Sequence, residues 1–186
     1  MKAFRHMAYL PLALFLLGAA PAVETATNPH PALEDLVIPS NSPVKFREWH
    51  EYGFAQFDGR FVLTGEFALN MTDNCEGAGE DCLALDIKPD LAIASRLPHW
   101  KDDAGEIWIG ITGEKQLVQT IASPRQRAAL VAGKIPHVTG RVSIVVDDFS
   151  AGGDCDSHWY TARFVKLAQP PKLALTDASG AVGCWA

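Results

Sequence analysis

Two stretches with the same pattern decide the fold of this chain: GRFVLTGEF (residues 59–67) and GKIPHVTGRVSIV (residues 133–145). In each, apolar residues alternate with others at the two-residue period of a β-strand. Each also has a glycine near its centre, Gly65 and Gly140. A glycine inside a strand commonly marks a bulge or a sharp bend. The pattern therefore predicts two long, strongly bent strands, over 61–70 and 138–146.

Three more strands follow from the same period. Alternating leucine and isoleucine predict a strand over 83–89, which ends at Pro89, and another over 107–111. The segment HWYTARFVKLA (158–168) predicts a fifth strand, apolar in part on both faces. Between it and the fourth strand, DDFSAGGDCDS (147–157) reads as a loop. The aromatic-rich segment 44–59 predicts a short strand or a lead-in turn.

One short helix is expected between the third and fourth strands. Ser123 is a good N-cap, Pro124 suits the first helical position, and Gly133 is a natural terminator. The segment between them predicts a helix of about ten residues.

The predicted order β-β-β-α-β-β, with bent first and fourth strands, resembles the OB-fold, a five-stranded Greek-key barrel. The resemblance covers residues 59–168 and rests on V-L-T-G at 62–65 and V-T-G at 138–140, the latter soon after a helix that ends in Gly-Lys. Exported bacterial OB-type domains of unknown function are similar in this respect. The resemblance implies an all-β domain with one short helix and carries no catalytic motif. Another small disulfide-stapled β-sandwich or barrel remains the alternative fold.

The first 22 residues have the features of a signal peptide. Lys2 and Arg5 precede an apolar run over 7–20, and Ala20-Pro21-Ala22 supplies a small-x-small cleavage site. The run is shorter than the roughly 20 apolar residues that span a bilayer. We therefore expect cleavage, export to the periplasm or the medium, and no membrane span in the mature chain.

The rest of the chain divides into three parts on this interpretation. A Pro-rich leader covers 23–43, the OB-like domain covers 44–170, and a C-terminal tail covers 171–186. Cleavage removes two basic and no acidic residues, which changes the formal charge from −6 to −8. An acidic chain repels phosphate, so nucleic acid is an unfavourable partner.

The four cysteines, Cys75, Cys82, Cys155 and Cys184, predict two disulfides in an oxidising compartment. Four cysteines allow three connectivities. We favour Cys75–Cys82, across the turn CEGAGEDC, and Cys155–Cys184, which would tether the tail. A zinc site is the alternative, but the chain has no C-x-x-C pair.

One acidic cluster could bind a metal. It consists of Asp147, Asp148, Asp154, Asp156 and His158. Calcium is bound by several oxygens on a flexible loop, which this segment offers. The ordered D-x-D-x-D-G spacing is missing, however, and Cys155 suggests a solvated loop held by a disulfide. The calcium site, and with it a small metal-dependent hydrolase that uses this loop, is the less favoured hypothesis.

Three tryptophans are candidate ligand contacts: Trp100, Trp108 and Trp159. Trp108 and Trp159 are out of phase with the apolar residues of their strands, so they should face away from the core. In OB-folds the face of the second and third strands binds ligands. The alternative is that a terminal segment covers these rings.

No nucleophile motif such as G-x-S-x-G occurs, and the histidines are scattered. Taken together, these features predict an exported, non-enzymatic binding or inhibitory module without a cofactor, whose partner is a protein or a saccharide. A structural or envelope-associated protein is a further possibility.

Overall fold

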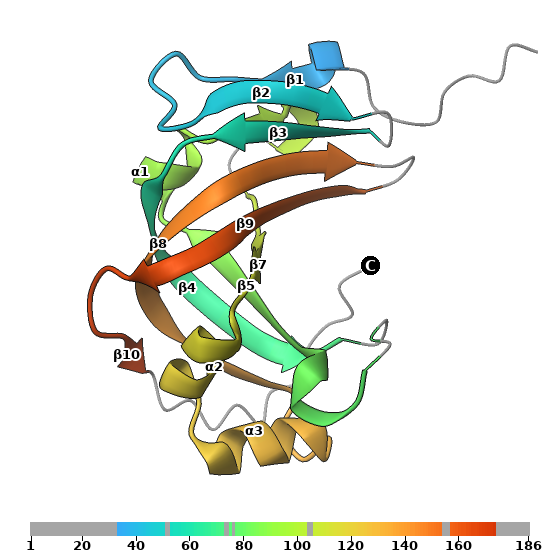
Figure 1. Cartoon of the computed structure of the whole chain (residues 1–186), viewed down its shortest axis with the longest axis vertical. Helices are drawn as coiled ribbons and strands as arrows, with labels where there is room; N and C mark the ends of the chain where they lie inside the picture. The colour runs from blue at the N-terminus through green and yellow to red at the C-terminus, as the bar shows by residue number, and fades with distance from the viewer. Residues whose placement is uncertain are drawn as a thin grey trace, which may run out of the picture.

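In the computed structural model the described residues are 33–50, 53–72, 75, 77–103, 106–153 and 157–173. This part of the chain is mostly β-structure, with three short helices (Figure 1). The predicted signal peptide, most of the predicted leader and most of the predicted tail lie outside it. No helix in the described ranges is long and apolar enough to cross a membrane.

The strands are β1 (Leu36–Val37), β2 (Lys45–His50), β3 (Phe54–Asp58), β4 (Phe61–Met71), β5 (Leu83–Pro89), β6 (His99–Trp100), β7 (Ile109–Thr112), β8 (His137–Gly153), β9 (His158–Leu167) and β10 (Lys172–Leu173). The α-helices are α1 (Leu91–Ala94), α2 (Lys115–Ile121) and α3 (Pro124–Val131), and 3-10 turns cover Leu33–Asp35, Gly79–Cys82 and Lys101–Asp103.

Five of the strands form a closed ring of pairings. β8 pairs with β4, β4 with β5, β5 with β7, β7 with β9, and β9 returns to β8. The β7–β9 pair is parallel and the others are antiparallel. Parallel neighbours need a long crossover connection, and here α2, α3 and β8 lie between them in the chain.

The bent first strand of the prediction is β4. Gly65 pairs with Pro89, and a Cβ atom at Gly65 would collide with the carbonyl group of Lys88. Glycine is required there because two backbones approach closely. The predicted strand over 83–89 is confirmed as β5, and the Cys75–Cys82 disulfide is present in the connection between β4 and β5. Cys155 and Cys184 lie outside the described residues.

The predicted helix is confirmed as α3. Its N-cap Ser123 accepts a hydrogen bond from the Gln126 N–H, and the Gln126 side chain accepts one from the Ser123 N–H in return. This reciprocal capping box satisfies two backbone donors at the helix start. The preceding helix α2 was not predicted, and it buries Leu117, Val118 and Ile121.

One prediction about β-structure was wrong and another was incomplete. Residues 147–153 are not a loop: they continue β8, which pairs with β3 on one edge and with β9 on the other. The aromatic segment 44–59 forms not one short strand but the β2–β3 hairpin, which extends the sheet beyond the ring. The polar and glycine residues of 147–153 hide this strand in the sequence, because its inward side chains are only Phe149 and Ala151, both fully buried.

The core lies inside the ring and continues beneath the hairpin extension. Among its largest fully buried side chains are Phe57, Phe67, Trp100 and Phe149. Trp100 belongs to β6, where it pairs with Leu36 of β1, and it is hydrogen-bonded to Gly152 of β8 and to Tyr160 of β9. One face of the strands β2, β3, β8, β9 and β7 therefore packs on the core, and the opposite, outer face is left for other contacts.

Candidate functional site

The outer face of the strands β2, β3, β8, β9 and β7 is the best candidate for a functional site. Strand alternation separates the two faces: Ala55, Ala151 and Tyr160 point inward and are buried, while their chain neighbours point outward. The strand register arranges the outward side chains in three rows, and each row runs across the strands.

The first row is aromatic. His50 pairs with Phe54, Phe54 with Gly152, and Gly152 with Trp159. The rings of His50 and Phe54 are stacked with centroids 4.2 Å apart, and those of Phe54 and Trp159 are 5.7 Å apart. The row therefore runs continuously from β2 to β9.

Gly152 allows this row to form. A Cβ atom at Gly152 would collide with the Trp159 indole, so the ring lies directly on the bare backbone of β8. Trp159 is nevertheless 38% exposed. The glycine thus supports one face of the indole and leaves the rest of it accessible.

Trp108 directly precedes β7, whose first residue Ile109 pairs with Tyr160. Strand alternation continued by one residue would put Trp108 on the same face as Trp159. Trp108 is 36% exposed. Of the three tryptophans singled out in the sequence, Trp159 thus stands on the outer face, and Trp108 lies next to the strand that pairs with β9.

The third tryptophan has a different place. Trp100 is only 1% exposed, and its indole N–H donates to the Gly152 carbonyl at 3.0 Å. Its backbone N–H donates to the Tyr160 hydroxyl at 3.0 Å, and that hydroxyl donates to Asp103 at 2.6 Å. Burial raises the pKa of Tyr160, chiefly through loss of water around the phenol. Trp100 is thus a core residue and does not contribute to the exposed aromatic row.

The second row is polar and mostly uncharged. Gln56, Ser150, Thr161 and Gly110 follow one another across β3, β8, β9 and β7, and Asp86 of β5 comes next. The hydroxyl oxygens of Ser150 and Thr161 are 2.6 Å apart. Burial raises the pKa of the Asp86 carboxyl. Gly110 contributes no side chain, which leaves space between Asp86 and Thr161.

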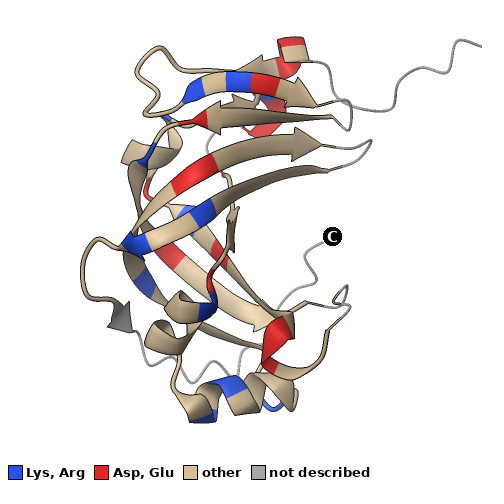
Figure 2. Ribbon diagram, in the orientation of Figure 1, with Lys and Arg blue, Asp and Glu red and all other residues tan. Residues whose placement is uncertain are grey.

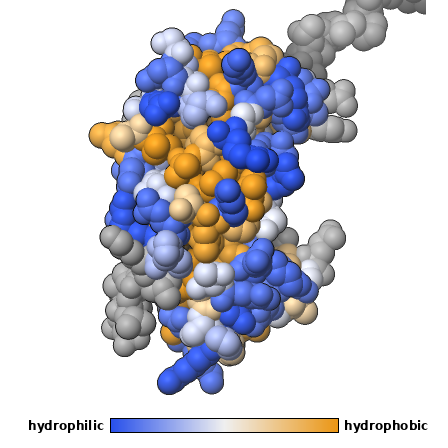
Figure 3. All heavy atoms as spheres, turned by 60° about the vertical axis from the view of Figure 1, so that its left-hand side comes forward, coloured by the Kyte–Doolittle hydropathy of each residue, from blue (hydrophilic) through white to orange (hydrophobic). Residues whose placement is uncertain are grey.

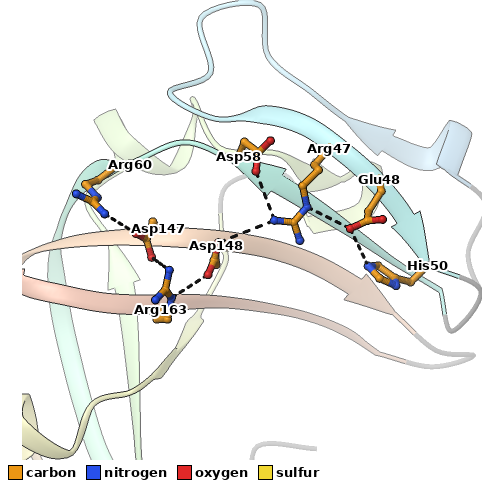
Figure 4. Close-up of polar contacts among 8 residues, drawn as sticks. All are labelled: Arg47, Glu48, His50, Asp58, Arg60, Asp147, Asp148 and Arg163. Atoms are coloured by element: carbon orange, nitrogen blue, oxygen red, sulfur yellow. Dashed lines mark hydrogen bonds and ion pairs between the residues drawn. The ribbon is translucent and has the colours of Figure 1, made fainter.

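The third row is charged and is drawn in Figure 4. Asp147 is bound by Arg60 at 2.9 Å and by Arg163 at 3.0 Å. Arg163 also binds Asp148 at 2.8 Å, and Asp148 lies 4.0 Å from Arg47. The network is completed by three contacts: Arg47 with Asp58 at 3.4 Å, Arg47 with Glu48 at 3.2 Å, and Glu48 with His50 at 3.6 Å.

A β-bulge brings the two aspartates together. Between Asp147 and Ser150 the chain advances three residues on β8 while β9 advances two, from Arg163 to Thr161. The extra residue is Asp148, whose φ is 48°. Because of this bulge, consecutive carboxylates meet the same guanidinium group.

Charge on this face is nearly balanced. Three guanidinium groups, from Arg47, Arg60 and Arg163, stand among the carboxylates of Glu48, Asp58, Asp147 and Asp148. Basic and acidic segments alternate over these strands in Figure 2. The network therefore presents no surplus of positive charge to an anionic ligand.

The predicted acidic metal cluster is not brought together by the residues that can be placed. Asp147 and Asp148 lie on the outer face in ion pairs, whereas His158 lies on the inner side, 3.0 Å from Asp103 and stacked on Trp100. Asp154 and Asp156 are outside the described residues. In the part of the chain that the structure describes, no group of three potential metal ligands converges.

A second surface is apolar. Figure 3 shows hydrophobic side chains gathered on the side of the molecule where Figure 1 places α1 and the corner between β3 and β4. Val62 is 46% exposed and Leu91 is 73% exposed. A shallow hollow there is lined by Pro43, Phe61, Val62, Ile93 and Arg96.

Sequence reasoning found Trp108 and Trp159 but missed Phe54, Gln56, Ser150 and Gly152. The phase of Trp159 against Tyr160 was a usable signal, because alternation assigns the two side chains to opposite faces. The missed residues lie on strands that were read as turn or loop, and the register that aligns them is not encoded in any local pattern.

Comparison of the chain with protein-family models, with curated proteins and with solved structures gave no match.

Proposed function

We propose that this chain is an exported, non-enzymatic binding module that takes its ligand on the outer face of β3, β8, β9 and β7. One observation carries the proposal: Trp159, which is 38% exposed, stands beside a row of polar side chains, and Trp108, which is 36% exposed, directly precedes the strand that pairs with β9. Sites that bind small molecules and chains combine apolar surface with a few placed polar groups. Exposed tryptophans beside such a row fit that description.

The OB-fold is the class we propose for the ring. In its favour, the ring has five strands, and its helices α2 and α3 fall between the third and fourth of them. Ligands of OB-folds bind on the face of the second and third strands, which here would be β5 and β7. Gly110 belongs to β7 and Trp108 directly precedes it, so the proposed site includes part of the face that the proposed fold would use.

Export is the second part of the proposal. The signal-peptide pattern of residues 1–22 motivates it, and the Cys75–Cys82 disulfide is consistent with an oxidising compartment. Expression of the full chain in a bacterial host with a Sec system tests it. We expect periplasmic or secreted protein whose N-terminal sequence begins at Val23; cytoplasmic protein that begins at Met1 would contradict it.

A binding role without catalysis is supported by how the ionisable groups of this face are used. Asp147 and Asp148 are both engaged by guanidinium groups, which hold them as structural ions. The pair between Arg163 and Asp148 joins two exposed groups, and such pairs contribute little to stability, about 0–1 kcal/mol. Asp147 is buried, so its two guanidinium partners compensate a carboxylate that has lost most of its water. Their more direct effect is to fix the side chains that border the polar row.

The test compares the wild type with a Trp108→Ser/Trp159→Ser double variant. The probes are a panel of neutral hexasaccharides and a phage library of random dodecapeptides, with intrinsic tryptophan fluorescence and selection as readouts. We expect binders of the wild type to lose at least tenfold in affinity for the double variant. Leu91→Ser, on the apolar surface, is the matched control and should bind like the wild type.

Equal binding of every selected probe to the wild type and to the double variant would contradict the proposed function. If the double variant binds like the wild type and Leu91→Ser loses affinity, the binding site lies on the apolar surface instead. Circular dichroism of each variant confirms that the fold is retained before affinities are compared.

A further inference from the structure

We propose that the ligand of this face is a neutral saccharide chain that lies across the strands, from Trp108 over Trp159 to Phe54. This inference rests on the proposed function and specifies its ligand class. It follows from four properties of the face: the aromatic row, the polar row, the balanced charge and the open position at Gly110.

The aromatic row suits the apolar faces of sugar rings. A pyranose presents C–H groups on its faces and hydroxyl groups around its edge, so an exposed indole can cover a face while the edge stays available. Trp159 offers such a surface, because Gly152 lets its ring lie against the sheet. Phe54 lies next to it across Gly152, and Trp108 directly precedes the strand on its other side.

The polar row suits the edges of the same rings. Of the two hydroxyl protons of Ser150 and Thr161, one is used in the 2.6 Å bond between them. Ser150 is only 7% exposed, so Thr161, which is half-buried, is the hydroxyl of the pair that a ligand would reach. Gln56 next to Ser150 adds an amide with donors and an acceptor, which matches hydroxyl groups that both donate and accept.

Charge on the face selects against anionic chains. Recognition of phosphate, sulfate or uronate commonly uses arginines whose guanidinium groups face the ligand. Arg47, Arg60 and Arg163 instead each contact carboxylates of the same surface. A neutral ligand does not have to displace these ion pairs.

Gly110 opens a position within the polar row. A Cβ atom there would lie 3.5 Å from the Asp86 Oδ1 atom and 3.8 Å from the Thr161 Cγ2 atom, which is ordinary contact. Alanine would therefore fit, and larger side chains would extend out over the face. Strand pairing places the Asp86 carboxyl directly across from Gly110, so a ligand hydroxyl that lies over the glycine would be next to it.

The register also sets the length of the ligand. From Phe54 on β3 to Trp108, the residue before β7, the row would cross three strand spacings, β3–β8, β8–β9 and β9–β7. At about 4.8 Å for each spacing, the row is roughly 14 Å long, which corresponds to a short run of about three sugar rings. Affinity should therefore rise with chain length up to about three rings and then level off.

Calorimetric titration of the purified mature protein tests this inference. The probes are cello-, chito-, xylo- and manno-oligosaccharides of one to six units, with heparin hexasaccharide and polyphosphate as anionic probes. We expect at least one neutral series to bind with the stated length dependence and with an affinity that changes less than twofold between 50 and 500 mM NaCl. The same series should lose at least tenfold on Trp159→Ala and on Gly110→Leu.

Matched variants guard against loss of fold. Trp159→Phe keeps an aromatic ring and should lose less affinity than Trp159→Ala, and Thr161→Ala tests the polar row without adding bulk. Leu91→Ser should bind like the wild type.

The outcomes separate this inference from the proposed function. If no neutral series binds but a selected dodecapeptide or an anionic probe binds in a Trp159-dependent way, the saccharide inference is wrong and the binding face stands. If no probe of any class depends on Trp159 or Trp108, both are wrong.

Discussion

At the scale of single residues, the outer face depends on positions where a side chain is absent. Gly152 lets the Trp159 indole lie on the backbone of β8, and Gly65 lets β4 approach the carbonyl group of Lys88. The two positions differ in what blocks a Cβ atom: a side chain at Gly152 and backbone at Gly65. A side chain can rotate away, whereas paired backbones cannot separate without breaking the ladder.

A double-mutant cycle tests the first contact. Gly152→Ala should lower the free energy of unfolding by about 1–3 kcal/mol, the range for overpacking. In a Trp159→Ala background the same change should cost at least 1 kcal/mol less, because the colliding ring is gone. Urea unfolding of the four proteins measures both values.

Gly110→Ala is the matched control for this cycle, since its Cβ atom would make only ordinary contacts, and it should cost little in either background. If Gly152→Ala lowers the free energy of unfolding by the same amount with and without Trp159, then something other than the indole excludes a side chain at position 152.

At the scale of elements, β8 explains why the site was only partly predictable. The alternating valine and isoleucine of its first half predict a strand from the sequence. Its second half, DDFSAGG at 147–153, does not, because aspartate, serine and glycine are typical of turns. Pairing on both edges and two inward residues, Phe149 and Ala151, nevertheless hold that half in the sheet. Tertiary context here overrides local propensity.

The bulge in β8 gives a prediction for Asp148. Its φ of 48° suits glycine and aspartate but disfavours β-branched residues. Asp148→Gly and Asp148→Val both remove the carboxylate that contacts Arg163. The difference between their free energies of unfolding therefore measures how well each residue tolerates the backbone conformation at position 148. We expect the valine variant to be less stable than the glycine variant by about 1–2 kcal/mol, the cost of the left-handed region.

Thermal and urea unfolding of both variants provide the measurement. Asp58, at the end of β3, is the control, because valine there should be at least as stable as glycine. If valine is also preferred at position 148, the bulge is not present in solution.

At the scale of the whole molecule, local patterns predicted the elements of the ring but not the way in which the sheet is extended. The strands 83–89 and 158–168 and helix α3 were readable because period and capping are local signals. The rows on the outer face come from the register between strands far apart in the chain. The sequence therefore supplied Trp108 and Trp159 as exposed candidates, and only the fold showed that β7 pairs with β9 and that Trp100 is buried.

Tyr160 connects the ring to the elements beneath the sheet. It lies on β9, its hydroxyl accepts from the backbone N–H of Trp100 on β6, and it donates to Asp103 in the adjacent 3-10 turn. Tyr160→Phe leaves both of these groups without their partner. We expect a loss of about 1–3 kcal/mol in the free energy of unfolding at pH 8, the cost of unsatisfied buried groups.

The loss of stability caused by Tyr160→Phe should also depend on pH, because Tyr160 itself titrates. Burial raises the pKa of Tyr160 in the folded protein above its ordinary value of about 10. A group with a raised folded pKa stabilises fully below its unfolded pKa, and this contribution declines as the pH rises above it, since the unfolded phenol ionises first. The stability gap between the wild type and Tyr160→Phe should therefore be constant from pH 7 to 9 and narrow by pH 11. Urea unfolding of both proteins at each pH measures it, and groups common to both cancel. A gap that stays constant to pH 11 would mean that the phenol is not buried as the fold requires.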